Sequence, residues 1–203
     1  MNLAHLPTPL EPLPRLGARL GIDDLWVKRD DLTGLALGGN KARKLELLLA
    51  DALEQGADTL VTGGGPQSNH ARITAAAAAA AGLDCHLALA GPVPDHADGN
   101  LLLDQLLGAT LHFEGAVDYD DIERSILAVA GRLAEAGRRP YAIPVGGASV
   151  VGAAAYALAV DELDAQVAAL GRPAFDWIVV ADGSGGTQAG LLAGLGAAPT
   201  RVL

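Results

Sequence analysis

The chain has 203 residues, of which 50% are hydrophobic and only 3% aromatic, and its formal net charge is −10. This length fits one large domain or two small ones, and the acidic balance argues against a nucleic-acid or anionic-membrane surface. No apolar run reaches the roughly 18 residues of a membrane span. The one cysteine cannot form an internal disulfide, and the five histidines show no metal-ligand spacing. Because no signal peptide is visible and Cys85 suits a reducing compartment, we expect a cytoplasmic protein without a metal.

Short apolar runs alternate with helical stretches along the chain. In chain order, the pattern predicts a strand at residues 25–28, a helix at 40–55, a strand at 59–62, a helix at 69–81, a strand at 85–90, a helix at 100–107 and a strand near 111. A charged helix at 119–136, a strand at 141–144, a long helix at 149–170, a strand at 177–181 and a helix at 187–195 follow. This alternation predicts an α/β fold with parallel sheets flanked by helices.

Several helix boundaries carry recognisable signals. We expect Asn40 to be the N-cap of its helix, and Gly56, Gly82 and Gly108 to follow the ends of three helices. Residues 201–203 look like the opening of another strand, so we expect a fragment whose C-terminal part is missing.

Lys41 lies in the segment Gly-Gly-Asn-Lys-Ala-Arg-Lys of residues 38–44, in the first turn of a predicted helix. The positive end of the helix dipole and desolvation would both lower the pKa of this lysine, as a Schiff-base lysine requires. The plain alternative is a solvated basic turn in which Lys41, Arg43 and Lys44 are all exposed.

The segment Gly-Gly-Gly-Pro-Gln-Ser-Asn-His of residues 63–70 follows a strand and opens a helix, where ligands bind in open α/β sheets. Ser68 and Asn69 can present hydroxyl, amide and backbone donors to a carboxylate or a phenolate oxygen. The alternative is an ordinary helix N-cap, which would contribute roughly 1 kcal/mol.

A third loop, Gly-Ser-Gly-Gly-Thr-Gln at residues 183–188, again lies between a strand and a helix. Its glycines let successive backbone N–H groups surround a phosphate, and two hydroxyls add donors. No Gly-Lys-Ser/Thr follows, so it is not a nucleotide P-loop, and Gln188 stands where a dinucleotide fingerprint has its third glycine. A candidate Schiff-base lysine, a ring-oxygen site and a phosphate loop together are what pyridoxal 5'-phosphate (PLP) needs.

These residues resemble the PLP-dependent D-cysteine desulfhydrase and 1-aminocyclopropane-1-carboxylate (ACC) deaminase family. The resemblance covers the chain through the segments PTPLEPLPRL, WVKRDDLTGLALGGNKARKLE, GADTLVTGGGPQSNHAR, NLLLDQLLGA, PYAIPVGGAS and GSGGTQAGL. It implies a two-domain, tryptophan-synthase-β-like (fold type II) PLP enzyme. In it, residues 1–43 and 156–203 would belong to the large PLP domain, which is truncated, and residues 44–155 would form the small α/β domain.

The resemblance also implies roles for individual residues. Lys41 would bind the cofactor covalently, Asn69 would hydrogen-bond its ring hydroxyl, and Ser68 would bind the substrate carboxylate or assist proton transfer. The phosphate would be held by Gly183, Ser184, Gly185, Gly186 and Thr187, with Lys44 assisting. Asp182 departs from the family pattern, which usually has a small residue there, and an acid beside a phosphate should weaken binding unless it points away.

The activity implied is α,β-elimination of D-cysteine, or a related β-substituted amino acid, to pyruvate, ammonia and sulfide. QSNH resembles the desulfhydrase branch, whereas the deaminase branch more typically has QSNQ. ACC deaminase is therefore the alternative enzyme, and a non-catalytic PLP-binding fragment or pseudoenzyme is the alternative of another class. The partner expected is a small amino-acid substrate, with no nucleic acid or membrane, and the full-length enzyme is expected to be a homodimer.

Overall fold

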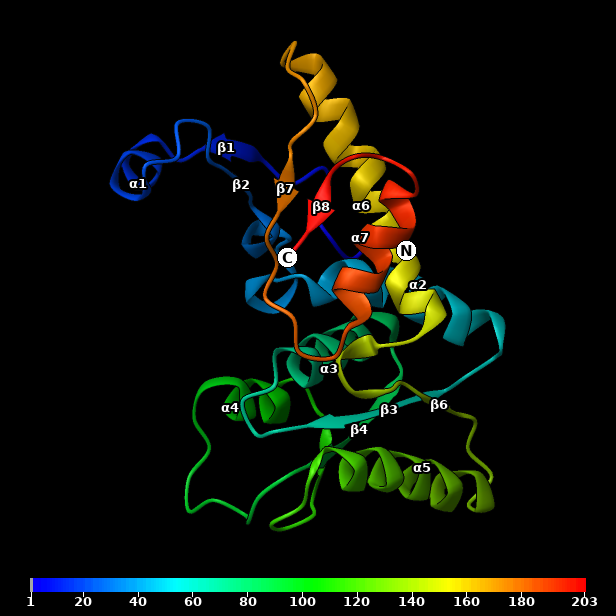
Figure 1. The fold of residues 1–203 in the computed structure, drawn as a ribbon. Helices are drawn as coiled ribbons and strands as arrows, with labels where there is room; N and C mark the ends of the chain where they lie inside the picture. Colours follow the sequence, from blue (N-terminus) through cyan, green and yellow to red (C-terminus); the bar gives the residue numbers. More distant parts are fainter. Residues whose placement is uncertain (1) are drawn as a thin grey trace.

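The computed structural model describes residues 2–203, in which short strands alternate with helices (Figure 1). The helices are α1 (Pro14–Leu20), α2 (Lys41–Glu54), α3 (Asn69–Ala81), α4 (Gly99–Leu106), α5 (Tyr119–Glu135), α6 (Val150–Ala169) and α7 (Gly186–Leu195). The strands are β1 (Leu10–Pro12), β2 (Trp26–Lys28), β3 (Thr59–Gly64), β4 (Asp84–Leu89), β5 (Thr110–Phe113), β6 (Pro140–Ala142), β7 (Trp177–Ile178) and β8 (Arg201–Val202). No helix within residues 2–203 combines the length and apolarity needed to cross a membrane.

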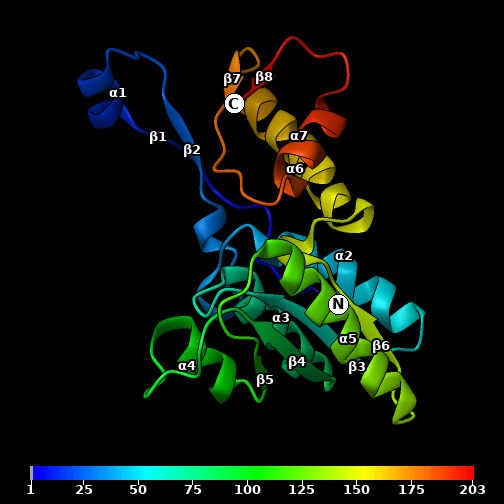
Figure 2. The ribbon, with the colours of Figure 1, turned by 60° about the horizontal axis from the view of Figure 1, so that its bottom comes forward.

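A four-stranded parallel sheet in the order β5-β4-β3-β6 forms the larger core. Its central strand β3 is buried along its whole length, as expected for a parallel strand covered on both faces. Helix α3 lies on one face of the sheet and α5 on the other (Figures 1 and 2). The register pairs Leu60 with Cys85, so the carboxyl ends of β3 and β4 meet at one edge. The predicted α/β fold with parallel strands is confirmed.

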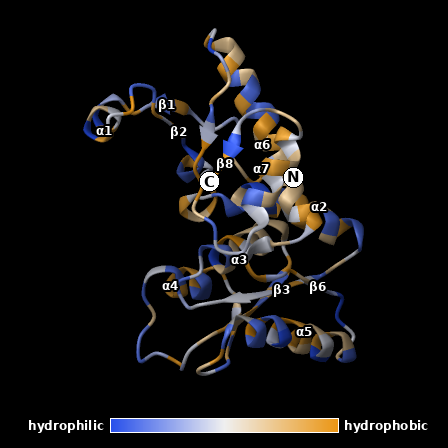
Figure 3. Ribbon diagram, in the orientation of Figure 1, coloured by the Kyte–Doolittle hydropathy of each residue, from blue (hydrophilic) through white to orange (hydrophobic). Residues whose placement is uncertain are grey.

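Helices α6 and α7 form a second apolar layer beside the short parallel pair β7-β8 (Figure 1). Both helices are coloured mostly hydrophobic in Figure 3. Glycines let them approach closely: a Cβ on Gly190 would come within 2.1 Å of the Ala153 carbonyl oxygen. The start of α7, where the third loop ends, is therefore fixed against α6.

Two elements were missed from sequence. Strand β1 pairs antiparallel with β2, and α1 follows β1 directly. Both are short and each contains one proline, so neither shows a clear hydrophobic period. The expected domain boundaries at 43/44 and 155/156 fall inside α2 and α6, and the division into two domains stays a prediction.

Candidate active site

A cavity of about 300 Å³ lies where the three loops singled out in the sequence meet. It is lined by Asn40, Lys41, Ser68, Asn69, His70, Val145, Gly146, Gly183 and Ser184. The structure thus brings together five of the predicted site residues from segments as far apart as Lys41 and Ser184. The turn containing Val145 and Gly146 forms another wall, which the sequence did not identify as part of the site.

Lys41 is the first residue of α2 and is half-buried at the cavity. Burial lowers the pKa of its amine, and the nearby carboxylate of Asp182 partly opposes that effect. The alternative of a fully solvated basic turn is wrong, because Arg43 is only 3% exposed and Lys44 is 0% exposed. A partly desolvated lysine at the helix start is suited to a reactive amine.

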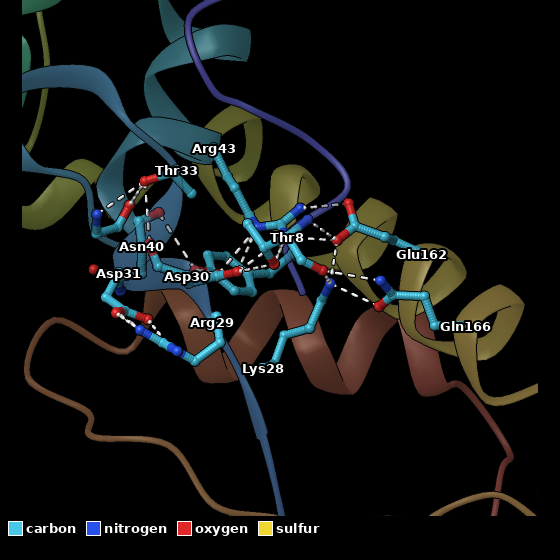
Figure 4. Close-up of polar contacts among 12 residues, drawn as sticks. Thr8, Lys28, Arg29, Asp30, Asp31, Thr33, Asn40, Arg43, Glu162 and Gln166 are labelled. Carbon is cyan, nitrogen blue, oxygen red and sulfur yellow. Dashed lines mark hydrogen bonds and ion pairs between the residues drawn. The ribbon is translucent and has the colours of Figure 1, made fainter. Parts of the chain in front are cut away.

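A buried polar network holds the beginning of α2 in place (Figure 4). The Arg43 guanidinium donates to Asp30 on one side and to Glu162 of α6 on the other, and it also reaches the Thr8 hydroxyl at 2.9 Å. Lys28 pairs with the same Glu162 carboxylate. The Arg43 guanidinium therefore connects the N-terminal segment, α2 and α6 two residues after Lys41.

Lys44 lies one turn further along α2, and its ammonium donates to the Gly146 carbonyl oxygen at 3.1 Å. Burial, and next the positive charge of Lys41, lower its pKa to about 8. Within residues 2–203 neither lysine forms an ion pair with a carboxylate. Two neighbouring cations with lowered pKa values favour the binding of an anion between or beside them.

Ser68 and Asn69 lie where β3 passes into α3. Ser68 is the N-cap of α3, since its Oγ accepts a hydrogen bond from the Ala71 backbone N–H at 3.2 Å. The capping interpretation is therefore correct, but Ser68 also lines the cavity together with Asn69. Gly64 makes this possible, because a Cβ there would come within 2.9 Å of Ser68 Oγ.

His70 also lines the cavity, a position that no sequence motif indicated. Its ring is buried, and its Nε2 lies 3.0 Å from Thr62 Oγ1, whose hydroxyl donates to the Ile143 carbonyl oxygen at 2.8 Å. The Thr62 hydroxyl proton is used in that bond, so His70 Nε2 must be the donor to Thr62 and Nδ1 carries no proton. Burial lowers the pKa of His70 to about 3, in agreement with a neutral ring.

The third loop begins α7 through Gly185, which has a left-handed conformation (φ +76°) that favours glycine. Gly186 lies against Lys44, because a Cβ there would come within 2.8 Å of its Nζ. Asp182 points toward the loop, and its Oδ1 accepts a hydrogen bond from the Gly185 N–H at 3.1 Å. It therefore does not point away from the expected phosphate site.

One expectation about this region is wrong. Asn40 has helical backbone angles and its side chain makes no cap hydrogen bond. Its Nδ2 instead donates to the Thr187 hydroxyl oxygen at 3.0 Å, which joins the turn before Lys41 to the third loop. Thr187 is 3% exposed, so its side chain acts in this link rather than at the cavity surface.

The model of one protein family, described as "Pyridoxal-phosphate dependent enzyme", matches residues 1–202. The chain belongs to this family of pyridoxal-phosphate-dependent enzymes. A D-cysteine desulfhydrase of Salmonella choleraesuis is 46% identical over 203 residues, with 96% of this chain and 60% of that protein covered. A protein of Pyrococcus horikoshii provisionally named an ACC deaminase is 46% identical over 195 residues and is covered to 58% of its length.

Comparison with solved structures gives the same fold. The crystal structure of an ACC deaminase homologue aligns with a TM-score of 0.87 at 46% identity, and covers 95% of this chain and 57% of that one. The crystal structure of the Escherichia coli diaminopropionate ammonia lyase aligns with a TM-score of 0.73 at 21% identity, and covers 94% of this chain and 54% of that one. At this identity the alignment shows only that the two chains share a fold. The resemblance and the fold type II class expected from sequence are confirmed, and the chain spans about three fifths of the length of these relatives.

The cavity suits the cofactor of this family. It offers an amine on Lys41, an amide on Asn69 and hydroxyls on Ser68 and Ser184. The buried ammonium of Lys44 adjoins the cavity, because it donates to the carbonyl oxygen of the lining residue Gly146. One wall requires glycine at position 146, because a Cβ on Gly146 would come within 2.4 Å of Ser184 Oγ. When bound, PLP supplies an electron-withdrawing ring that stabilises negative charge on the α-carbon of an amino acid.

Proposed function

We propose that this chain is the cofactor-bearing part of a lyase that breaks down D-cysteine, or a related β-substituted amino acid, with water to give pyruvate, ammonia and sulfide. The observation that carries the proposal is the common cavity of Lys41, Ser68 and Asn69, which places a reactive amine beside hydroxyl and amide donors. The 46% identity to a D-cysteine desulfhydrase supports the choice of substrate.

Lys41 is proposed to hold the cofactor covalently and to exchange a proton with the substrate once it is released. Its burial favours the neutral amine that bond formation requires. The network of Arg43 keeps the start of α2 in place, so the amine is presented from a rigid helix end.

Ser68 is proposed to face the substrate, and Asn69 the cofactor ring oxygen. The start of α3 offers hydroxyl and backbone donors to a substrate carboxylate. The phosphate is proposed to bind at Gly183, Ser184, Gly185 and Gly186, with Lys44 adding positive charge. Thr187 is proposed to act there indirectly, because its hydroxyl is held by Asn40.

ACC deaminase remains the second candidate, because relatives with that name are equally similar to this chain. A non-catalytic PLP-binding protein is the candidate of another class. We further propose that the full-length protein is a homodimer in the cytoplasm; the buried thiol of Cys85 is compatible with a reducing compartment.

The three candidates are separated by supplying the PLP-loaded full-length protein with D-cysteine and, separately, with ACC. We expect sulfide and pyruvate from D-cysteine, and little 2-oxobutanoate from ACC. Release of 2-oxobutanoate without sulfide would assign the deaminase activity instead. Bound PLP with neither product would favour the non-catalytic alternative.

A further inference from the structure

The side-chain oxygen of Asn69 is held by two donors. Arg72 Nη1 donates to Asn69 Oδ1 at 3.1 Å, and Asn100 Nδ2 donates to the same oxygen at 3.0 Å. A carbonyl oxygen has two acceptor positions, so both are used. Because Asn69 lines the cavity, its NH₂ group is the part of the amide left to face that space.

The chemistry of the neighbours fixes this orientation. Arginine can only donate and a backbone carbonyl can only accept. Asn100 Oδ1 accepts from Arg72 Nη1 at 2.8 Å, and Asn100 Nδ2 donates to the Gln67 carbonyl oxygen at 2.7 Å. Asn100 therefore cannot be turned over, and the atom of Asn69 that its NH₂ group meets must be the oxygen.

Arg72 also reaches the loop that carries Lys41. Its Nη2 donates to the Gly38 carbonyl oxygen at 2.9 Å, three residues before Lys41. The Arg72 side chain is almost fully buried, and the negative charge of Asp104 from α4 partly offsets the effect of burial, which lowers the pKa of Arg72. One buried guanidinium thus fixes the relative positions of the two loops that meet at the cavity.

We infer that Arg72 and Asn100 are positioning residues that hold the Asn69 amide with its NH₂ group toward the cofactor ring oxygen. The inference rests on the proposed function, in which Asn69 contacts that oxygen. A donor there stabilises the deprotonated ring oxygen, whereas an amide carbonyl in the same place would repel it. Arg72 and Asn100 do not line the cavity themselves and act on it through Asn69.

The test is a pH titration of the visible absorption of PLP in the loaded full-length protein. Asn100→Asp replaces the donor that faces Asn69 Oδ1 with an acceptor, so the Asn69 NH₂ group is expected to turn toward the new carboxylate. An acid in the first turn of α4 is favourable for the helix, which protects the fold. Asn69→Ala removes the amide, and Asn2→Asp adds the same charge at an exposed residue as a control.

We expect Asn69→Ala and Asn100→Asp each to raise the pH midpoint of the band by about one unit, the size expected for losing one hydrogen bond to a charged oxygen. In the variant that carries both changes, the pH midpoint should shift no further than in Asn69→Ala alone, because both changes act through the same amide. Asn2→Asp should leave the midpoint unchanged.

Two results would overturn the inference, and they differ from each other. A shift in Asn69→Ala with none in Asn100→Asp would keep the cofactor contact and remove the positioning role. An unchanged pH midpoint in Asn69→Ala would show that Asn69 does not contact the ring oxygen. Arg72 and Asn100 would then have no positioning role toward the cofactor.

Discussion

The carboxylate of Asp182 accepts a hydrogen bond from the backbone N–H of Gly185 at 3.1 Å. That N–H belongs to the loop proposed to bind the cofactor phosphate. A negatively charged side chain therefore occupies one of the backbone donors that the phosphate would use. Asp182 also favours the charged forms of Lys41 and Lys44. The acid therefore has two opposite effects on the site: it favours the charged forms of Lys41 and Lys44, which would attract the phosphate, and it repels the phosphate directly.

Removing the charge of Asp182 should strengthen cofactor binding. Asp182→Asn keeps an oxygen that can accept from Gly185 but removes the repulsion, and we expect the Kd for PLP to fall about fivefold, roughly 1 kcal/mol. The measurement is an absorbance titration with PLP. Weaker binding in the variant would mean that holding Lys41 and Lys44 in their charged forms matters more than the repulsion.

Gly186 should be intolerant of a side chain. A Cβ there meets Lys44 Nζ at 2.8 Å and Ala148 Cα at 3.2 Å, so the ammonium must move away from the phosphate site. We expect Gly186→Ala to raise the Kd for PLP at least tenfold, about 1.4 kcal/mol. Gly131→Ala is the matched control, because that glycine lies within α5 and an added Cβ meets nothing within 4 Å. Equal affinities in the two variants would remove Gly186 from the site.

The two roles of Ser68 can be separated by comparison with Ser149. Both serines are N-caps: Ser149 accepts from the Gly152 N–H at 3.1 Å and does not line the cavity. Each change to alanine should cost about 1 kcal/mol of stability. Only Ser68→Ala should lower the kcat/KM for D-cysteine in the full-length protein, by roughly 10²-fold. If both variants turn over substrate like the parent, Ser68 is a helix cap and nothing more.

Lys44 should make the stability of the cofactor-free chain depend on pH. Its folded-state pKa of about 8 lies below the ordinary 10.5, so between these values the unfolded chain binds more protons than the folded one. The free energy of unfolding therefore rises with pH across this window, and Lys44→Met should remove the contribution of Lys44 to that rise. Urea unfolding of the parent and the variant at both ends of the window measures it. Parallel pH profiles would show that the Lys44 ammonium is not disfavoured by burial.

The central fold was predictable from sequence because its signals are local. Apolar runs followed by glycine marked the strands and helices from residue 59 onward, and Gly82 ends α3 with φ +70° as expected. Strand β1 and helix α1 were missed because segments this short carry too few residues to show a period.

The contacts that complete the site were not predictable, because their partners are distant in sequence. Asn40 resembles an N-cap locally, yet its side chain binds Thr187, 147 residues away. Arg72 resembles any charged helix residue until the fold places Gly38 and Asn100 beside it. The motifs thus identified the loops, whereas the orientation of their side chains depends on tertiary contacts.

Lys41 is proposed to hold the cofactor, and the most direct test is to make that bond permanent. The PLP-loaded full-length protein is reduced with borohydride and digested, and the modified peptide is sequenced by mass spectrometry. We expect the label on Lys41, and its loss in Lys41→Ala with the fold intact by circular dichroism. A label on Lys44, or one that persists in Lys41→Ala, would contradict the assignment.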